Sequence, residues 1–108
     1  MKLVGEYIRE LREKQKLPLR KVAAYLDIDT SILSKIERGE RPVNLDLISK
    51  ISQFFSLDES NLLTEYLGEE IARKVYQANN IEKIFKIAER KAEYLKSKAL
   101  KQGKIEFK

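Results

Sequence analysis

The chain has 108 residues and a formal net charge of +5, and it contains neither cysteine nor histidine. This composition excludes disulfides, thiolate nucleophiles, histidine acid–base chemistry and the usual ligands of zinc and haem. No acidic cluster has the spacing of a metal-binding loop and no glycine-rich phosphate loop is present, so we expect no enzymatic activity, no cofactor and no metal.

Helical periodicity begins in the stretch LVGEYIRELREKQ, in which Val4, Ile8 and Leu11 recur on one face. This first predicted helix ends before Leu17-Pro18, because the residue before a proline is disfavoured in the helical conformation. A proline also suits the start of a helix, and LRKVAAYL at residues 19–26 has apolar residues at helical spacing. We therefore predict a second short helix there.

The third predicted helix covers residues 30–38. Asp29 is expected to cap its first amides with its carboxylate, and Gly39 is expected to end it in the left-handed conformation. Leu33 and Ile36 fall on one side of this helix and predict its buried face. The opposite face consists of small polar and basic side chains.

Two further helices follow in the same half of the chain. Asn44 is expected to cap a helix at residues 45–55, and Asp58 is expected to cap the segment ESNLLTEYL. No alternating pattern of a strand competes with these helices. The predicted fold class is all-α, with a five-helix domain at residues 1–66 and a helical C-terminal extension at residues 67–108.

The extension contains a long predicted helix at residues 81–102, which holds neither proline nor glycine. Its apolar residues recur at three- and four-residue steps, close to a heptad pattern. A helix with one apolar stripe must bury it, so the stripe is expected either to pack on its own domain or to form a dimer or partner surface. The residues of this surface are Ile81, Ile84, Phe85, Ala88, Ala92 and Leu95. The segment GKIEFK at residues 103–108 is expected to be a frayed tail.

Residues 4–66 resemble the Cro/repressor-type, or XRE-like, family of helix-turn-helix DNA-binding transcriptional regulators. The resemblance is carried by IRELREKQKL in the first helix, VAAYLDID across the turn, ILSKIERGER in the third helix, and LDLISKISQFF followed by SLDESNLL. It implies that the helix at residues 30–38 lies in the major groove of double-stranded DNA. It also implies a homodimer that reads a palindromic operator.

The resemblance assigns base reading to Thr30, Ser31 and Lys35, with Ser34 as a neighbour. Short hydroxyls allow close approach to base edges, and Lys35 can reach the acceptors of guanine. Ile32 either packs locally or touches a thymine methyl group. The candidate phosphate contacts are Arg20, Lys21, Arg38, Arg41 and Asn44.

Glu37 would repel phosphate if it faced the groove. The resemblance suggests instead that it turns inward and pairs with Arg12 as a structural ion pair. The sequence departs from the family at Pro18-Leu19, where a Thr/Ser-Gln commonly provides a contact to the DNA backbone. Arg20 is a candidate replacement for that contact.

The distribution of charge keeps a second function open. Residues 1–66 contain eleven Lys/Arg and eleven Asp/Glu, whereas residues 67–108 contain eleven and six, so the second half carries all of the net charge. The alternative is a protein-interaction module, antitoxin-like or regulator-binding, whose C-terminal helices bind an acidic protein partner. The lysines of residues 96–108 are also candidates for non-specific attraction to phosphate.

Charged residues recur along the beginning of the chain from position 6 onward, so it does not have the pattern of a signal peptide. No apolar run approaches the ~20 residues that span a bilayer. We therefore expect a cytoplasmic protein without a membrane partner.

Overall fold

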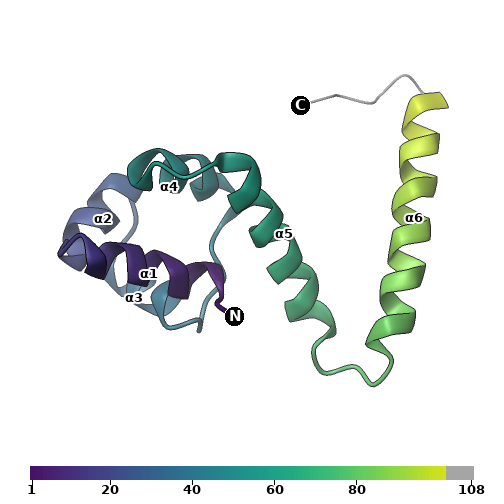
Figure 1. Ribbon diagram of the computed structural model, residues 1–108, viewed down its shortest axis with the longest axis horizontal. Coiled ribbons are helices and arrows are strands. Elements are labelled where there is room, and N and C mark those ends of the chain that lie inside the picture. The colour runs from purple at the N-terminus through teal and green to yellow at the C-terminus, as the bar shows by residue number, and fades with distance from the viewer. Residues whose placement is uncertain (102–108) are drawn as a thin grey trace. The chain divides into compact units, whose positions relative to one another are not determined.

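The structure, a computed structural model, describes residues 1–101. These residues are all-α, as the sequence predicts, and contain no strand. The elements are α1 (Val4–Lys14), α2 (Leu19–Leu26), α3 (Thr30–Glu37), the 3-10 turn η1 (Leu45–Leu47), α4 (Ile48–Phe55), α5 (Glu59–Val75) and α6 (Ile81–Lys101) (Figure 1). Residue 102 and the predicted tail at 103–108 lie outside the described residues. The chain divides into two compact units, Met1–Arg73 and one that begins at Lys74.

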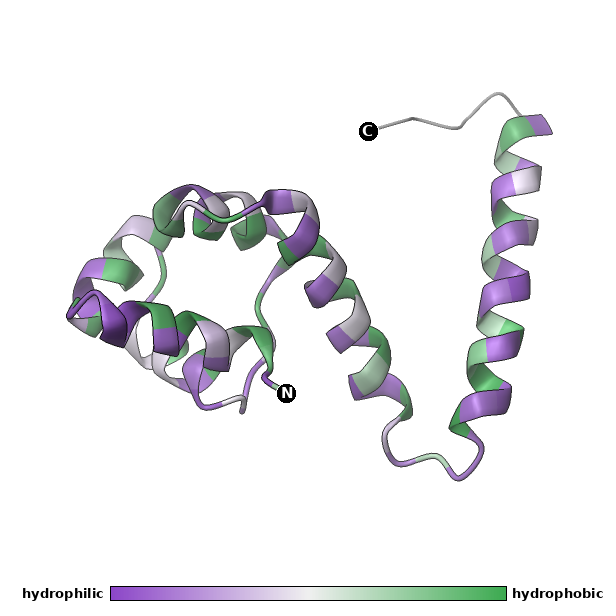
Figure 2. Ribbon diagram, viewed as in Figure 1, coloured by the Kyte–Doolittle hydropathy of each residue, from purple (hydrophilic) through white to green (hydrophobic). Residues whose placement is uncertain are grey.

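The first unit is built around one apolar core to which all of the helices from α1 to α5 contribute. Its helices are short and amphipathic, with hydrophobic and hydrophilic residues alternating around each ribbon (Figure 2). Burial of one apolar side of each helix provides most of the stability of so small a domain. The buried apolar residues are Val4, Ile8, Val22, Ala23, Leu26, Leu33, Ile36, Val43, Ile48, Ile51, Phe55, Leu62 and Tyr66.

Gly5 allows α1 to lie directly against the end of α3. A Cβ atom at this position would come closer than 3.0 Å to both the carbonyl oxygen and the carbonyl carbon of Ile36. Those are backbone atoms, which cannot move without moving α3. Glycine in a helix costs about 1 kcal/mol relative to alanine, so its presence in α1 is explained by this close approach.

An ion pair joins the other end of α1 to the same last turn of α3. Nε and Nη2 of Arg12 donate to the two carboxylate oxygens of Glu37 at 2.8 and 2.9 Å. Nη1 of Arg12 donates to the carbonyl oxygen of Leu17 at 2.9 Å. The hydrogen bonds to Glu37 raise the pKa of the Arg12 guanidinium above its ordinary value. The structure thus brings Arg12 and Glu37 together, with Glu37 only 3 % exposed.

α5 is one continuous helix of 17 residues, whereas the sequence pattern divides this region into two segments after residue 66. Gly68 lies inside it, and two side-chain pairs one turn apart, one spanning Gly68 and one following it, offset the helix-weakening effect of a glycine. The Tyr66 hydroxyl donates to Glu70 at 2.9 Å, and Arg73 donates to Glu69 at 3.1 Å. The predicted boundary between residues 66 and 67 therefore falls within a helix.

In the second unit, α6 has 21 residues, none of which is buried. None of the helices described here is long and apolar enough to cross a membrane.

Replacement of Gly5 by alanine should destabilise the first unit by about 1–3 kcal/mol, because the added methyl group overpacks a site closed by backbone atoms. Gly68→Ala is the matched control, since nothing lies within 4 Å of a Cβ added there. The control should raise the free energy of unfolding by up to about 1 kcal/mol. Urea unfolding followed by circular dichroism measures both. Equal stabilisation by the two alanines would show that α1 and α3 are not in close contact.

Replacement of Arg12 by alanine should cost about 3–5 kcal/mol, because it leaves the buried Glu37 carboxylate without its partner. The double variant Arg12→Met/Glu37→Leu should recover most of that loss, since it removes both charges and keeps apolar volume. Thermal unfolding of the two variants and the parent tests this. A wild-type melting temperature for Arg12→Ala would refute the structural role of the pair.

Candidate nucleic-acid interface

A tight turn places α3 against α2. Asp27 adopts the left-handed conformation with φ of 57°. The N–H of Ile28 donates to the carbonyl oxygen of Ala23 at 3.0 Å, which closes the end of α2. Asp29 then occupies the N-cap position of α3 in an extended conformation. The turn between the two helices therefore consists of residues 27–29 alone (Figure 1).

The predicted side-chain cap at Asp29 is wrong. Its carboxylate makes no cap hydrogen bond to the first-turn amides of α3. The helix begins instead with the backbone bond from Leu33 N–H to the carbonyl oxygen of Asp29, at 3.0 Å. The side chain of Asp29 is exposed, and water solvates its charge. By contrast, Asn44 and Asp58 each accept a hydrogen bond from the amide two residues ahead, at 3.0 Å.

The two faces of α3 have opposite environments. Leu33 and Ile36 are 0 % and 3 % exposed and anchor the helix in the core. Thr30, Ser31 and Lys35 are exposed, and Ser34 is half-buried. The helix therefore presents a row of two hydroxyls and a lysine to solvent while its aliphatic side is fixed. Ile32, the ambiguous position, is half-buried and packs against the core.

The end of α3 carries a short chain of polar contacts. Gly39 has φ of 76°, the left-handed conformation that ends the helix. Nε of Arg38 donates to a carboxylate oxygen of Glu40, and Nη1 of Arg38 donates to Oγ of Ser34, both at 2.5 Å. The hydrogen bond with Glu40 raises the pKa of Arg38 and, in turn, lowers the pKa of Glu40.

Glu40 is a residue that sequence reasoning missed. The signal for it was an acid and a base on either side of a helix-ending glycine, in the string RGE. Because the left-handed glycine reverses the chain, the side chains before and after it come within reach of each other.

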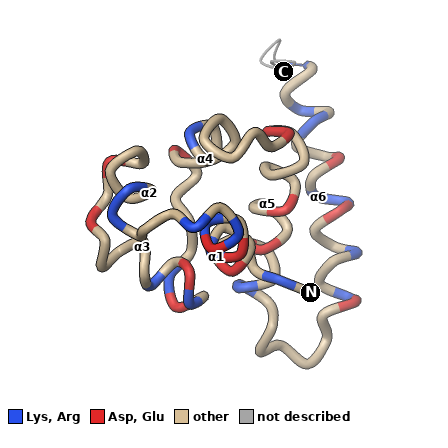
Figure 3. The backbone as a smooth tube through the Cα atoms, turned by 60° about the vertical axis from the view of Figure 1, so that its left-hand side comes forward, with Lys and Arg blue, Asp and Glu red and all other residues tan. Residues whose placement is uncertain are grey.

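Basic residues flank the α2–α3 pair at the start of α2 and after the end of α3 (Figure 3). Arg20 and Lys21 on α2 are exposed, as is Arg41 after α3. Asn44 is exposed too, and its Oδ1 accepts from the amide of Asp46 at 3.0 Å. The side-chain NH₂ of Asn44 keeps its donors for another partner. The predicted phosphate contacts thus lie at the two ends of the helix pair.

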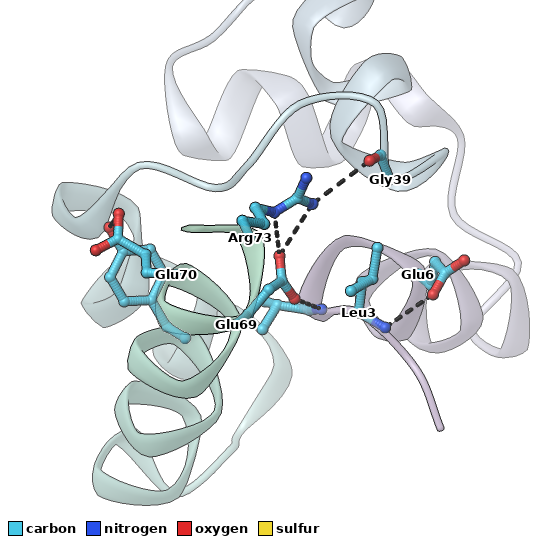
Figure 4. A network of polar contacts seen from close by, with 8 residues as sticks. Leu3, Glu6, Gly39, Glu69, Glu70 and Arg73 are labelled. Carbon is cyan, nitrogen blue, oxygen red and sulfur yellow. Dashed lines mark hydrogen bonds and ion pairs between the residues drawn. The ribbon is translucent and has the colours of Figure 1, made fainter. Parts of the chain in front are cut away.

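A polar network from α5 supports α1 and the end of α3, and it too was missed from the sequence (Figure 4). One oxygen of Glu69 accepts from the N–H of Val4 at 2.7 Å, at the first residue of α1. The other accepts from Arg73, whose Nη2 also donates to the carbonyl oxygen of Gly39 at 3.4 Å. Glu69 therefore supplies the N-terminal cap that Leu3, at the N-cap position, lacks. The partners are 65 and 34 residues apart in sequence.

The acidic side chains of α5 near Tyr66 take part in contacts within the first unit. Glu69 and Glu70 are both used in structural contacts, with Arg73 and with the hydroxyl of Tyr66. Burial and the contact with Glu70 raise the pKa of Tyr66. Among residues 1–101, no group of three or more acidic side chains is placed to hold a metal ion.

The predicted partner surface lies along α6 in the second unit. None of its side chains is buried. Phe85 is 45 % exposed and Leu95 is 64 % exposed, while Ile81 and Ile84 are half-buried. The remaining two positions, Ala88 and Ala92, are exposed.

Comparison with known proteins places the first unit in a family. A helix-turn-helix family model matches residues 8–62. The chain is 37 % identical over 62 residues to the control protein C.BamHI of Bacillus amyloliquefaciens, a match that covers 56 % of this chain and 76 % of that one. It is 34 % identical over 55 residues to a putative HTH-type transcriptional regulatory protein of Thermococcus kodakarensis, which covers 51 % of this chain and only 17 % of that protein.

A solved structure shares the fold. The crystal structure of the clp gene regulator ClgR from Corynebacterium glutamicum matches with a TM-score of 0.50 and 20 % sequence identity, covering 82 % of this chain and 88 % of that one. The match to the family model includes the whole of α2, the turn and α3 described above. The chain belongs to the XRE-type helix-turn-helix family of DNA-binding transcriptional regulators.

Proposed function

We propose that the chain binds double-stranded DNA in a sequence-specific manner as a homodimer, and reads a palindromic operator through α3. The observation that carries this proposal is the division of α3 into a buried aliphatic side and an exposed side of hydroxyls and lysine. The major groove of DNA is wide enough to admit such a helix. A helix that is fixed on one side and polar on the other can enter the groove without disturbing the core.

The roles follow from the chemistry of the side chains. Lys35 donates to O6 or N7 of a guanine, and the hydroxyls of Thr30 and Ser31 contact base edges close to the helix. The phosphate contacts fix the register of α3 on the duplex but carry no sequence information. They are Arg20, Lys21, Arg38, Arg41 and the side-chain amide of Asn44.

The relatives support a regulatory role. Their names describe a control protein, a transcriptional regulatory protein and a gene regulator. The match covers 76 % of the control protein C.BamHI, so the similarity extends over most of that protein and beyond a single motif.

Dimerisation is proposed to occur through α6. A single helix-turn-helix reads few base pairs, and a two-fold dimer places two recognition helices about one DNA turn apart, ~34 Å. In the structure of residues 1–101 no residue of α6 is buried, and Phe85 and Leu95 are 45 % and 64 % exposed. Two copies of α6 could bury their stripes against each other in the manner of a coiled coil.

A second surface competes for this role. On α5, the side chains of Leu63, Leu67 and Ile71 are 36 %, 47 % and 46 % exposed. Their spacing of four residues places them on one face of the helix. Dimerisation through α5 would leave α6 free for a protein partner, which is the alternative function of the C-terminal half. The two arrangements can be distinguished by substitution, because the dimer should dissociate only when apolar residues of the helix that forms the contact, α5 or α6, are replaced.

Lys35→Ala should weaken specific binding about tenfold or more, because one good base contact is worth ~1–3 kcal/mol. The measurement is a gel shift on DNA from upstream of the protein's own coding sequence, at ~50 mM salt, where electrostatic binding is strong. Lys83→Ala is the matched control, since Lys83 is an exposed lysine on α6 and its removal changes the net charge equally.

A specific shift that Lys35→Ala abolishes and Lys83→Ala preserves, with both variants folded, would support the DNA-reading role. No shift by the parent chain at this salt concentration would favour the protein-interaction module instead. Equal weakening by both lysine variants would mean that the contact depends on net charge alone.

Phe85→Glu combined with Leu95→Glu should convert the dimer to a monomer, because like charges replace the apolar stripe of α6 at both positions. Sedimentation equilibrium of the full chain measures the mass. The matched variant Leu67→Glu/Ile71→Glu should remain dimeric. The opposite result, dissociation by the α5 variant only, would assign the dimer contact to α5.

A further inference from the structure

Ser34 differs from the other helical serine and threonine side chains that form hydrogen bonds in the described chain. Ser52 and Thr64 each donate their proton back to a backbone carbonyl one turn earlier, to Ile48 at 2.9 Å and to Ser60 at 3.0 Å. Ser34 has no such bond within residues 1–101, and it accepts from Nη1 of Arg38 instead. Its proton is therefore not committed to the backbone of its own helix.

The contact with Arg38 determines how the Ser34 hydroxyl can act. A serine hydroxyl has one proton to donate and two lone pairs to accept with. Because a cationic N–H occupies a lone pair of Ser34, the hydroxyl proton points away from the guanidinium. The oxygen is also a poorer acceptor for any second donor that approaches from the DNA. Ser34 in this arrangement is a better hydrogen-bond donor than acceptor.

Glu40 holds Arg38 in this position. Its carboxylate accepts from Nε of Arg38, so the guanidinium is bound at one edge by Glu40 and at another by Ser34. A guanidinium has five N–H donors in a fixed planar fork, and these two bonds leave three of them free. Arg38 can thus keep both contacts and still donate to a DNA phosphate through Nη2.

We propose that Arg38 and Glu40 are positioning residues that fix Ser34 as a donor toward a base edge, so that Ser34 selects against cytosine at the base it faces. This inference rests on the proposed function. In the major groove, guanine offers N7 and O6, adenine offers N7 and thymine offers O4 as acceptors, whereas cytosine presents only its amino donor. A donor fixed at Ser34 can bond to the first three and not to cytosine.

The test is selection of bound sequences from a pool of duplexes with a random central segment, with sequencing of the enriched pools. The full-length parent is compared with Ser34→Ala, Arg38→Lys and Glu40→Gln, each checked for a folded circular dichroism spectrum. One base position in the parent pool should exclude cytosine by about tenfold, the lower range of a good base contact. All three variants should lose that exclusion and keep the preferences at the other positions.

Arg9→Lys is the matched control, because Arg9 is exposed on α1 and is not among the proposed DNA contacts. It should leave the exclusion of cytosine intact. Arg38→Lys retains the positive charge, so the DNA affinity of this variant should depend on salt concentration as strongly as that of the parent. A phosphate-only role for Arg38 would leave the base preference of Arg38→Lys unchanged.

The outcomes separate this inference from the proposed function. If the parent enriches a sequence and the Arg38 and Glu40 variants keep every base preference, the positioning role is overturned while DNA reading stands. If the parent enriches no sequence, both the reading function and the selection by Ser34 are refuted. Loss of the same single base preference in all three variants is the result that supports the positioning role.

Discussion

A buried carboxylate determines how α3 is held. Glu37, in the last turn of α3, is 3 % exposed, and isolated burial of such a charge would cost several kcal/mol. Arg12 offsets that cost with two hydrogen bonds to the Glu37 carboxylate, and this bidentate contact holds α1 against α3. Gly5 adds a second constraint, because it lets the two backbones approach at the other end of α1. The exposed side of α3 is presented in one orientation as a consequence.

The same arrangement explains how a half-chain without net charge can serve as a DNA reader. The Glu37 carboxylate is buried and pairs with Arg12, so its negative charge does not face a phosphate. Glu40 is exposed, but it is occupied by Arg38. The positive side chains that remain at the start of α2 and after α3 lie at the ends of the helix pair, where phosphates would flank the groove in the proposed complex. Local placement of charge therefore matters more here than the total.

The helices of the first unit could be predicted because their apolar residues keep strict helical spacing and their ends carry proline, glycine or a capping side chain. The continuity of α5 could not be predicted, because Gly68 weakens a helix locally. The pairs Tyr66–Glu70 and Glu69–Arg73 offset that weakening, but they depend on side-chain geometry. Likewise, Gly5 has no local signature. Its purpose is a contact with Ile36, 31 residues later, and only the packing of α1 on α3 reveals it.

The candidate site shows the same division. The hydroxyls and lysine on α3 follow from the helical period, because Leu33 and Ile36 define the opposite side. The capping of α1 by Glu69 joins residues 65 apart in the chain, so no pattern in the sequence could indicate it. Asp29 is the opposite case, a contact that the sequence predicts and the structure lacks. Aspartate is favoured at the N-cap position, but this side chain makes no cap hydrogen bond. Whether such a side chain hydrogen-bonds to the backbone or stays in solvent depends on local geometry, which the residue type alone does not determine.

The central claim is that the exposed face of α3 meets the DNA. Titration of isotopically labelled protein with an operator duplex, followed by amide resonances in two-dimensional NMR, tests it most directly. The largest shifts should fall on residues 30–35, with a second set at the start of α2 and at residues 38–44. Shifts confined to α6, with α3 unchanged at saturating DNA, would contradict it.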